Sequence, residues 1–236
     1  MTHPNPEIFD IDRAEIALEA WSWPFAADRG ADIDRYFAEL KSQRPGVWNG
    51  RVLLLNRYAI AERTLRGACF EIDYASFITW RDREFPDPSV FNFFAAAALR
   101  AADGGYLLGE MASYTAGAGR TYFPCGTPEP ADIGADGALD LGDNLRRELL
   151  EETGIAIAEL DAEPGWTVVH DRCFLGLMKR LTARQSADEV RARIMRHIAS
   201  DTRPELADIR IVRGPADIDS SMPPSVVAYL QREWTR

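Results

Sequence analysis

Residues 134–155 read GADGALDLGDNLRRELLEETGI, and this stretch decides how the rest of the sequence is interpreted. On a helix, Glu148, Glu151 and Glu152 stand at positions i, i+3 and i+4, so their carboxylates project from one face. Like charges at this spacing repel each other unless a cation compensates them. A hard divalent ion such as Mg²⁺, or Mn²⁺ in its place, prefers oxygen ligands of this kind. The pattern therefore predicts a metal-binding face on a helix.

The neighbouring residues indicate how this helix begins, ends and is supported. Asp143 or Asn144 is expected to cap its start, because short polar side chains accept hydrogen bonds from the first free backbone N–H groups. Gly154 stands where a left-handed residue commonly ends a helix. Arg147 precedes Glu151 by four residues, within reach for an ion pair that holds the carboxylate in place. The stretch is predicted to fold as a loop, a helix and a second loop.

Residues 147–155 read RELLEETGI, which fits the second half of the Nudix box, RE-U-x-EE-x-G-U with U apolar, at every fixed position. By this motif the chain resembles a Nudix hydrolase. A surface helix that is rich in carboxylates and ends at glycine is the structural alternative, and it suffices to explain the shorter EExG pattern. The full match is much rarer by chance, because it constrains more positions.

The resemblance implies a fold and an activity. The fold is an α/β/α sandwich with a mixed sheet, formed by residues 91–236 and preceded by an N-terminal α/β extension at residues 1–90. The activity is Mg²⁺-dependent cleavage of a small-molecule nucleoside diphosphate linked to another moiety. Glu148, Glu151 and Glu152 would hold the metal, with Glu151 and Arg147 also in catalytic or supporting roles. A Nudix-like binding or adaptor module with weakened turnover is the alternative function.

The first half of the motif is irregular. The family pattern has a glycine, five residues, a glutamate and seven further residues before the arginine. Here Gly134 and Asp140 keep the first spacing, but only six residues separate Asp140 from Arg147, and the acid is an aspartate. Asp140 is therefore either a metal ligand in a diverged loop or a turn or capping residue. The preceding segment, residues 122–130, looks like the family's strand that ends in PGG, followed by an insertion rich in Pro, Asp and Gly.

A fourth carboxylate, acting as a metal ligand or as the general base that orients water, is expected from beyond the motif. Glu163, Glu189 and Glu205 are the candidates. Glu189 has capping-box spacing with Ser186, and Glu163 stands beside a Pro-Gly pair in a predicted solvated turn. Glu205 enters the loop before an expected strand and is the chosen candidate. A solvated loop glutamate is its structural alternative.

The remaining pattern of residues 92–236 predicts strands flanked by helices. Apolar runs at residues 93–101 and 106–111 surround Asp103-Gly104, a strong hairpin signal. Helices are expected after the Ser186 cap and from about residue 224 to 234. Strands are also expected at residues 121–123 and 209–212, and residues 166–170 and 173–181 are expected to form two further strands or one bent strand.

The first ninety residues are predicted to form a small α/β layer that contributes to a homodimer or to a lid over the substrate. Helices are expected at residues 33–40 and 74–83, strands at 51–58 and 65–72, a helix stop at Pro45-Gly46 and a linker at Asp87-Pro88. The segment PGVWNG, from Pro45 to Gly50, is reminiscent of the nucleotide-sugar branch of the family.

Composition excludes several other classes of function. With 27 Lys and Arg against 37 Asp and Glu, the formal net charge of −10 disfavours nucleic acid and anionic membranes as partners. Neither a signal sequence nor a long apolar segment is recognisable, so the cytoplasm is the expected location. The three cysteines and three histidines have no spacing typical of zinc sites, and neither zinc nor disulfides are expected.

Overall fold

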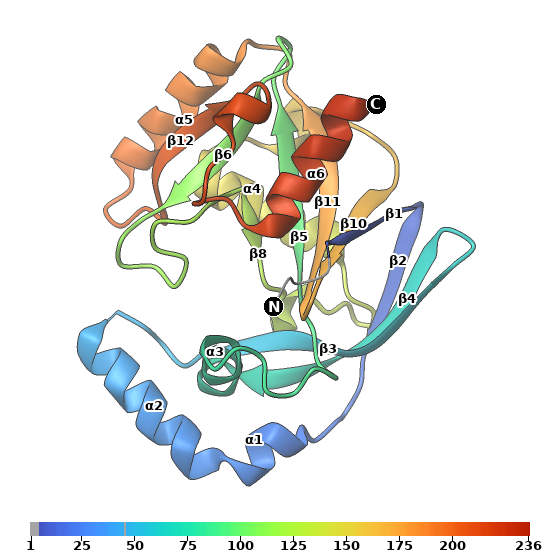
Figure 1. Cartoon of the computed structure of the whole chain (residues 1–236), viewed down its shortest axis with the longest axis vertical. Helices are drawn as coiled ribbons and strands as arrows, with labels where there is room; N and C mark the ends of the chain where they lie inside the picture. Colours follow the sequence, from blue (N-terminus) through green and yellow to red (C-terminus); the bar gives the residue numbers. More distant parts are fainter. Residues whose placement is uncertain (1–4, 45) are drawn as a thin grey trace.

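The computed structural model describes residues 5–44 and 46–236, which form two β-sheets with helices around them (Figure 1). The predictions made for Pro45 lie outside the described residues. The larger sheet has the strand order β1-β10-β11-β5-β6-β12. Its six main strands are β1 (Glu7–Ile11), β5 (Asn92–Arg100), β6 (Tyr106–Met111), β10 (Trp166–Asp171), β11 (Phe174–Thr182) and β12 (Leu206–Val212). Three short strands extend it: β7 (Thr121–Tyr122) pairs with β6, β8 (Cys125–Gly126) with β5, and β9 (Asp161–Ala162) with β11.

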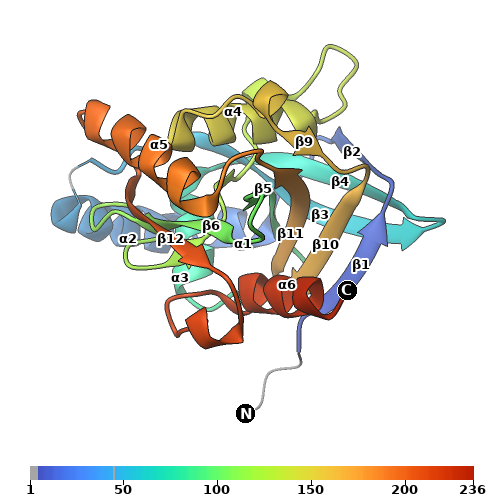
Figure 2. The same cartoon turned by 90° about the horizontal axis from the view of Figure 1, so that it is seen from above.

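This sheet is mixed, because β11 and β5 run parallel in its centre while the other main strand pairs are antiparallel. Helices α4 (Leu141–Thr153) and α5 (Ala187–Ser200) cover one face, and α6 (Pro224–Thr235) covers the other (Figure 2). The arrangement is an α/β/α sandwich, as predicted.

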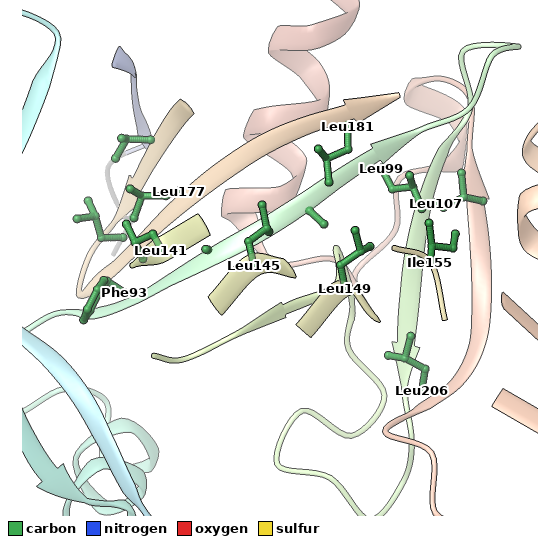
Figure 3. Packing of buried hydrophobic residues seen from close by; sticks show 14 of the residues in the cluster. Phe93, Leu99, Leu107, Leu141, Leu145, Leu149, Ile155, Leu177, Leu181 and Leu206 are labelled. Carbon is green, nitrogen blue, oxygen red and sulfur yellow. The ribbon is translucent and has the colours of Figure 1, made fainter. Parts of the chain in front are cut away.

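Apolar residues at helical spacing explain why α4 lies on the sheet. Leu145 and Leu149 are 1% and 0% exposed, and they pack in one core cluster with Phe93 and Leu177 of the sheet (Figure 3). A second cluster under α6 includes Tyr229 and lies on the opposite face. Burying apolar side chains of this size contributes about 1.5–3 kcal/mol each, so α4 is fixed firmly on the sheet and its polar face is left for the site.

The second sheet has the order β2-β4-β3 and comes entirely from the first part of the chain. Its strands are β2 (Arg13–Leu18), β3 (Arg51–Ala61) and β4 (Thr64–Asp73), and the helices beside it are α1 (Pro24–Asp28), α2 (Gly30–Gln43) and α3 (Tyr74–Asp82). Trp23, Phe70 and Trp80 pack together in its core. The elements expected at residues 33–40, 51–58, 65–72 and 74–83 are therefore present.

The first ninety residues also take part in the larger sheet. Strand β1 pairs antiparallel with β10, with Glu7 opposite His170. Leu53, Leu55 and Leu65 of the second sheet belong to the same core cluster as Leu145 of α4. The two parts thus share a hydrophobic core, whereas the boundary near residue 90 stays a prediction about folding units. Within the described residues, no helix is both long enough and apolar enough to cross a membrane.

Candidate active site

Helix α4 begins one residue after Asp140. The Asp140 carboxylate accepts a hydrogen bond of 2.9 Å from the backbone N–H of Asp143, so Asp140 is the capping residue. The cap expected at Asp143 or Asn144 is wrong, because burial of Leu141 extends the helix towards its N-terminus. For Asp140 itself, the structure supports the capping alternative. The helix ends at Gly154, whose φ of 66° is the left-handed conformation that was predicted.

A buried aspartate outside the predicted set anchors the helix. Asp132 is 5% exposed and accepts hydrogen bonds from Asn144 Nδ2 at 3.0 Å and from the backbone N–H of Glu129 at 2.9 Å. Its carboxylate also lies 3.3 Å from a guanidinium nitrogen of Arg147. Sequence reasoning missed Asp132 because it belongs to the Pro- and Asp-rich insertion before the helix. Its only sequence signal is an acid followed by the apolar Ile133.

Arg147 connects this anchor to the glutamates. Its guanidinium lies 2.8 Å from a carboxylate oxygen of Glu148 and 3.5 Å from one of Glu151. The predicted pair between Arg147 and Glu151 is present, but it is longer than the contacts of Arg147 with Glu148 and Asp132. Arg147 is therefore placed to hold Glu148 foremost.

Glu148 lies against the backbone of β8. A Cβ built on Gly126 would come within 2.2 Å of the Glu148 carboxylate, so only glycine leaves room for that side chain here. Burial raises the pKa of Glu148 to about 7, against the opposing effect of Arg147. The glycine of the strand that looks like PGG thus has a physical role in seating a glutamate of the helix.

Glu152 is the most deeply buried of the three glutamates. Only 7% of the residue is exposed, and its Oε2 atom is buried without a hydrogen-bond partner. Burial and the neighbouring charges of Glu148 and Glu205 raise its pKa well above the usual range, although the backbone N–H of Cys125 donates a hydrogen bond to it. An acceptor left unpaired in this way costs free energy and fits a cation as its partner.

Glu151 and Glu205 complete the carboxylate group. The Glu151 side chain is 60% exposed, so the three glutamates of the motif differ in burial. Burial and the charge of Glu151 raise the pKa of Glu205. The charge of Glu205 in turn helps to raise the pKa of both Glu148 and Glu152. The charge of Glu205, the candidate chosen from the sequence, therefore acts on two glutamates of the box helix.

The two rejected candidates lie in structural contacts. Glu189 accepts hydrogen bonds from the Ser186 hydroxyl at 2.6 Å and from the Ser186 backbone N–H at 2.9 Å, which is the predicted capping box. Glu163 forms an ion pair of 2.7 Å with Arg180 at the α6 face of the sheet. Neither appears among the charges that act on Glu148 or Glu152.

Among residues 5–44 and 46–236, no three His, Cys, Asp or Glu side chains converge closely enough to hold a metal ion as they stand. Glu148 contacts Arg147 at 2.8 Å. The donor set nevertheless suits a hard divalent ion, because it consists of carboxylate oxygens and includes the unpaired Oε2 of Glu152. Glu148, Glu151, Glu152 and Glu205 are the residues that could bind it.

The helix with residues 147–155 lies on one face of a mixed sheet, opposite α6, with its glutamates beside β8. This is the arrangement that the motif implied. The predicted α/β/α sandwich with a mixed sheet is thus confirmed. Glu148 of the motif lies against β8, and the charge of Glu205 acts on Glu152.

The chain is similar to known proteins in its structure and not in its sequence. No protein-family model and no curated protein matches the chain. Solved Nudix structures do: RenU, a Nudix hydrolase from M. smegmatis, has 18% identity and a TM-score of 0.41, covering 62% of this chain and 87% of its own. A Nudix hydrolase from Nitrosomonas europaea has 19% identity and a TM-score of 0.40, with coverages of 61% and 89%. A MutT protein from Methanosarcina mazei has 15% identity and a TM-score of 0.35, with coverages of 62% and 96%.

Proposed function

We propose that this chain is a Nudix pyrophosphohydrolase that uses Mg²⁺, or Mn²⁺ in its place, to cleave a nucleoside diphosphate linked to another moiety. The observation that carries the proposal is the pair of Glu148 and Glu152 on the box helix, of which Glu148 is half-buried and Glu152 is buried with an unpaired oxygen. Two carboxylates that are largely removed from solvent and whose pKa values are both raised are costly to ionise. A bound divalent cation would remove this cost, and the carboxylates would be its ligands.

Each residue of the site has a distinct task in this proposal. When bound, the metal would neutralise the diphosphate and polarise the attacked phosphorus. Glu148 and Glu152 supply buried carboxylate oxygens, and Glu151 supplies an exposed one on the solvent side. Arg147, itself anchored by Asp132, orients Glu148 through its 2.8 Å contact. Glu205 accepts the proton of the attacking water as general base or adds a further ligand oxygen.

A nucleotide sugar is the substrate that we propose to test first. The segment from Gly46 to Gly50 is part of the PGVWNG sequence that resembles that branch of the family. Within it, Trp48 is 78% exposed, so this aromatic ring is free to contact a ligand and is not needed for the core. Aromatic rings of this kind stack on nucleobases and sugars.

A substrate panel tests the function. Nucleotide sugars, dinucleotides and nucleoside triphosphates would be incubated with the protein, with and without Mg²⁺ or Mn²⁺, and monophosphate products would be measured. Metal-dependent release of a nucleoside monophosphate from one class is the expected result. The irregular first half of the box favours the alternative, a binding or adaptor module. Folded protein that binds a nucleotide but yields no product with any metal would establish that alternative.

A further inference from the structure

The segment that follows β6 is bonded directly to the backbone around Glu205. The backbone N–H of Ala112 donates to the carbonyl of Glu205 at 2.8 Å. The Tyr114 hydroxyl donates to the carbonyl of Pro204, the residue just before Glu205. The guanidinium of Arg203 lies 5.2 Å from the centre of the Tyr114 ring. Residues 112–114 therefore determine where the backbone of the Glu205 loop lies.

Two arginines of the N-terminal region hold the next residues of the same segment. Arg44, which follows α2, donates to the carbonyl of Thr115 at 3.3 Å. Arg81 of α3 donates to the carbonyl of Ala116 at 3.4 Å. Figure 1 shows this loop after β6 extending towards the N-terminal helices. Both contacts join the N-terminal region to the loop through main-chain carbonyls, so they fix its backbone whatever its side chains.

A third contact joins the two parts next to Glu205. A Cβ built on Gly46 would come within 1.8 Å of the Arg203 guanidinium, so this arginine lies between the Gly46 backbone and the Tyr114 ring. Arg81 is itself held by Asp82 at 2.9 Å, and Asp82 accepts a hydrogen bond of 2.7 Å from Tyr36. Arg81 is thus oriented by its own neighbours as well as by the loop.

The charge of Glu205 acts on a group of this region and on a group of the box helix. Burial is the main cause of the raised pKa of Tyr74, at the start of α3, and the charges of Arg81, Arg44 and Glu205 all act on it. Glu205 acts in the same way on Glu152 of α4. The same carboxylate therefore influences titrating groups in both parts of the molecule.

We propose that Tyr114, Arg44 and Arg81 are positioning residues that connect the N-terminal region to the active site by holding the backbone on which Glu205 is carried. The connection runs from the two arginines to the carbonyls of residues 115 and 116, and from Tyr114 to the carbonyl of Pro204. This inference rests on the proposed function, since it gives Glu205 a role in the reaction. It assigns the first ninety residues a task beyond their share of the core.

The test is a double-mutant cycle on the full-length protein with the substrate and metal identified by the panel. One side-chain hydrogen bond contributes about 0.5–1.5 kcal/mol, so Tyr114→Phe should lower kcat about three- to tenfold. The KM should change by less than about twofold, because the bond does not touch substrate. In a Glu205→Gln background the Tyr114→Phe change should have no further effect, since the group that it positions is already gone.

The arginines provide a second, independent arm. Arg44→Gln and Arg81→Gln should each lower kcat with little change in KM, and Arg81→Lys, which keeps a donor for the carbonyl, should restore much of the rate. Arg66→Gln is the matched control, because Arg66 of the same region pairs with Glu15 at 2.9 Å and does not contact the loop. If Tyr114→Phe fails to fold, as shown by its thermal melt, this arm decides the question.

The outcomes separate this inference from the proposed function. The positioning role is overturned if Tyr114→Phe lowers kcat by the same factor with and without the Glu205 carboxylate. It is also overturned if Arg44→Gln and Arg81→Gln both keep the wild-type rate. A wild-type rate in Glu205→Gln, together with inactive Glu152→Gln, overturns the inference and leaves the proposed function intact. A wild-type rate in Glu152→Gln itself overturns the proposed function.

Discussion

Glu148 and Glu152 are the residues on which the proposed chemistry depends most directly, because both carboxylates are largely removed from solvent and Glu152 has an oxygen without a hydrogen-bond partner. We predict that Glu148→Gln and Glu152→Gln each lower turnover by several orders of magnitude. The metal-free protein should remain as stable as the wild type or become more stable, since a like-charge repulsion is removed. Steady-state rates with Mg²⁺ and thermal melts in EDTA check both parts. Glu39→Gln, on the exposed side of α2, is the control. Near-wild-type rates in either variant would show that the proposed metal site is wrong.

Burial of Glu148 also gives the metal-free protein a pH-dependent stability. The folded pKa of Glu148 is raised from its ordinary value of 4.5 to about 7, so between these values the folded state keeps a proton that the unfolded state has lost. The Glu148 carboxyl should therefore lower stability as the pH rises through this window, by about 3 kcal/mol in the free energy of unfolding. Urea denaturation in EDTA at pH 5 and pH 8 measures the change.

The Glu148→Gln variant is the reference for that measurement. It has no titrating carboxyl at this position, so its stability should depend less on pH than that of the wild type. Adding Mg²⁺ at pH 8 should raise the stability of the wild type, because the ion binds only the folded state. The stability of the variant should rise less. If the stability of the two proteins changed with pH in the same way, the Glu148 carboxyl would not be the cause of the pH dependence.

At the scale of the element, Asp140 and Asp132 give opposite expectations. Asp140→Asn should change stability by only a few tenths of a kcal/mol and leave the rate unchanged, because asparagine caps a helix as well as aspartate does. Asp132→Asn weakens the ion pair with Arg147 in a buried site and should cost about 1–3 kcal/mol. Thermal melts and kcat for the two variants decide. A large loss of metal-dependent activity in Asp140→Asn would make that residue a ligand after all.

The difference between these two aspartates shows where prediction from sequence ends at this scale. Helical periodicity, the Gly154 stop and the Ser186 cap depend on residues three or four apart, and the structure has all three. The contact of Asp132 with Arg147 spans fifteen residues across an insertion, and no local pattern indicates it. The acid that pairs with Arg147 from upstream of the helix is Asp132, and it lies outside the irregular first half of the box.

At the scale of the whole molecule, the α/β/α sandwich follows from one motif and a run of alternating strands and helices. Strands β1 and β2 were not predicted, because β1 is stabilised by pairing with β10, more than 150 residues away. Glu205 was chosen as a candidate because it enters the loop before an expected strand of the sheet. The contacts of Arg44 and Arg81 with the loop after β6 could not be predicted, since they join segments that are distant in sequence through backbone carbonyls.

The shared core leads to a prediction about the N-terminal region. Residues 90–236 expressed alone should be poorly soluble or inactive, because the fragment lacks the strand that pairs with β10. It also exposes core that Leu53, Leu55 and Leu65 cover in the full chain. Size-exclusion chromatography, circular dichroism and the panel assay would measure solubility, folding and activity.

Co-expression of residues 1–89 with this fragment is the matched control, and it should recover soluble and active protein if the missing contacts are the cause. Recovery of solubility without activity would indicate that the covalent connection is needed to hold the loop after β6. A fragment 90–236 that is soluble, monodisperse and fully active by itself would show instead that the sandwich needs neither β1 nor the second sheet. In that case the contacts of Arg44 and Arg81 would have no part in turnover, because the fragment contains neither residue.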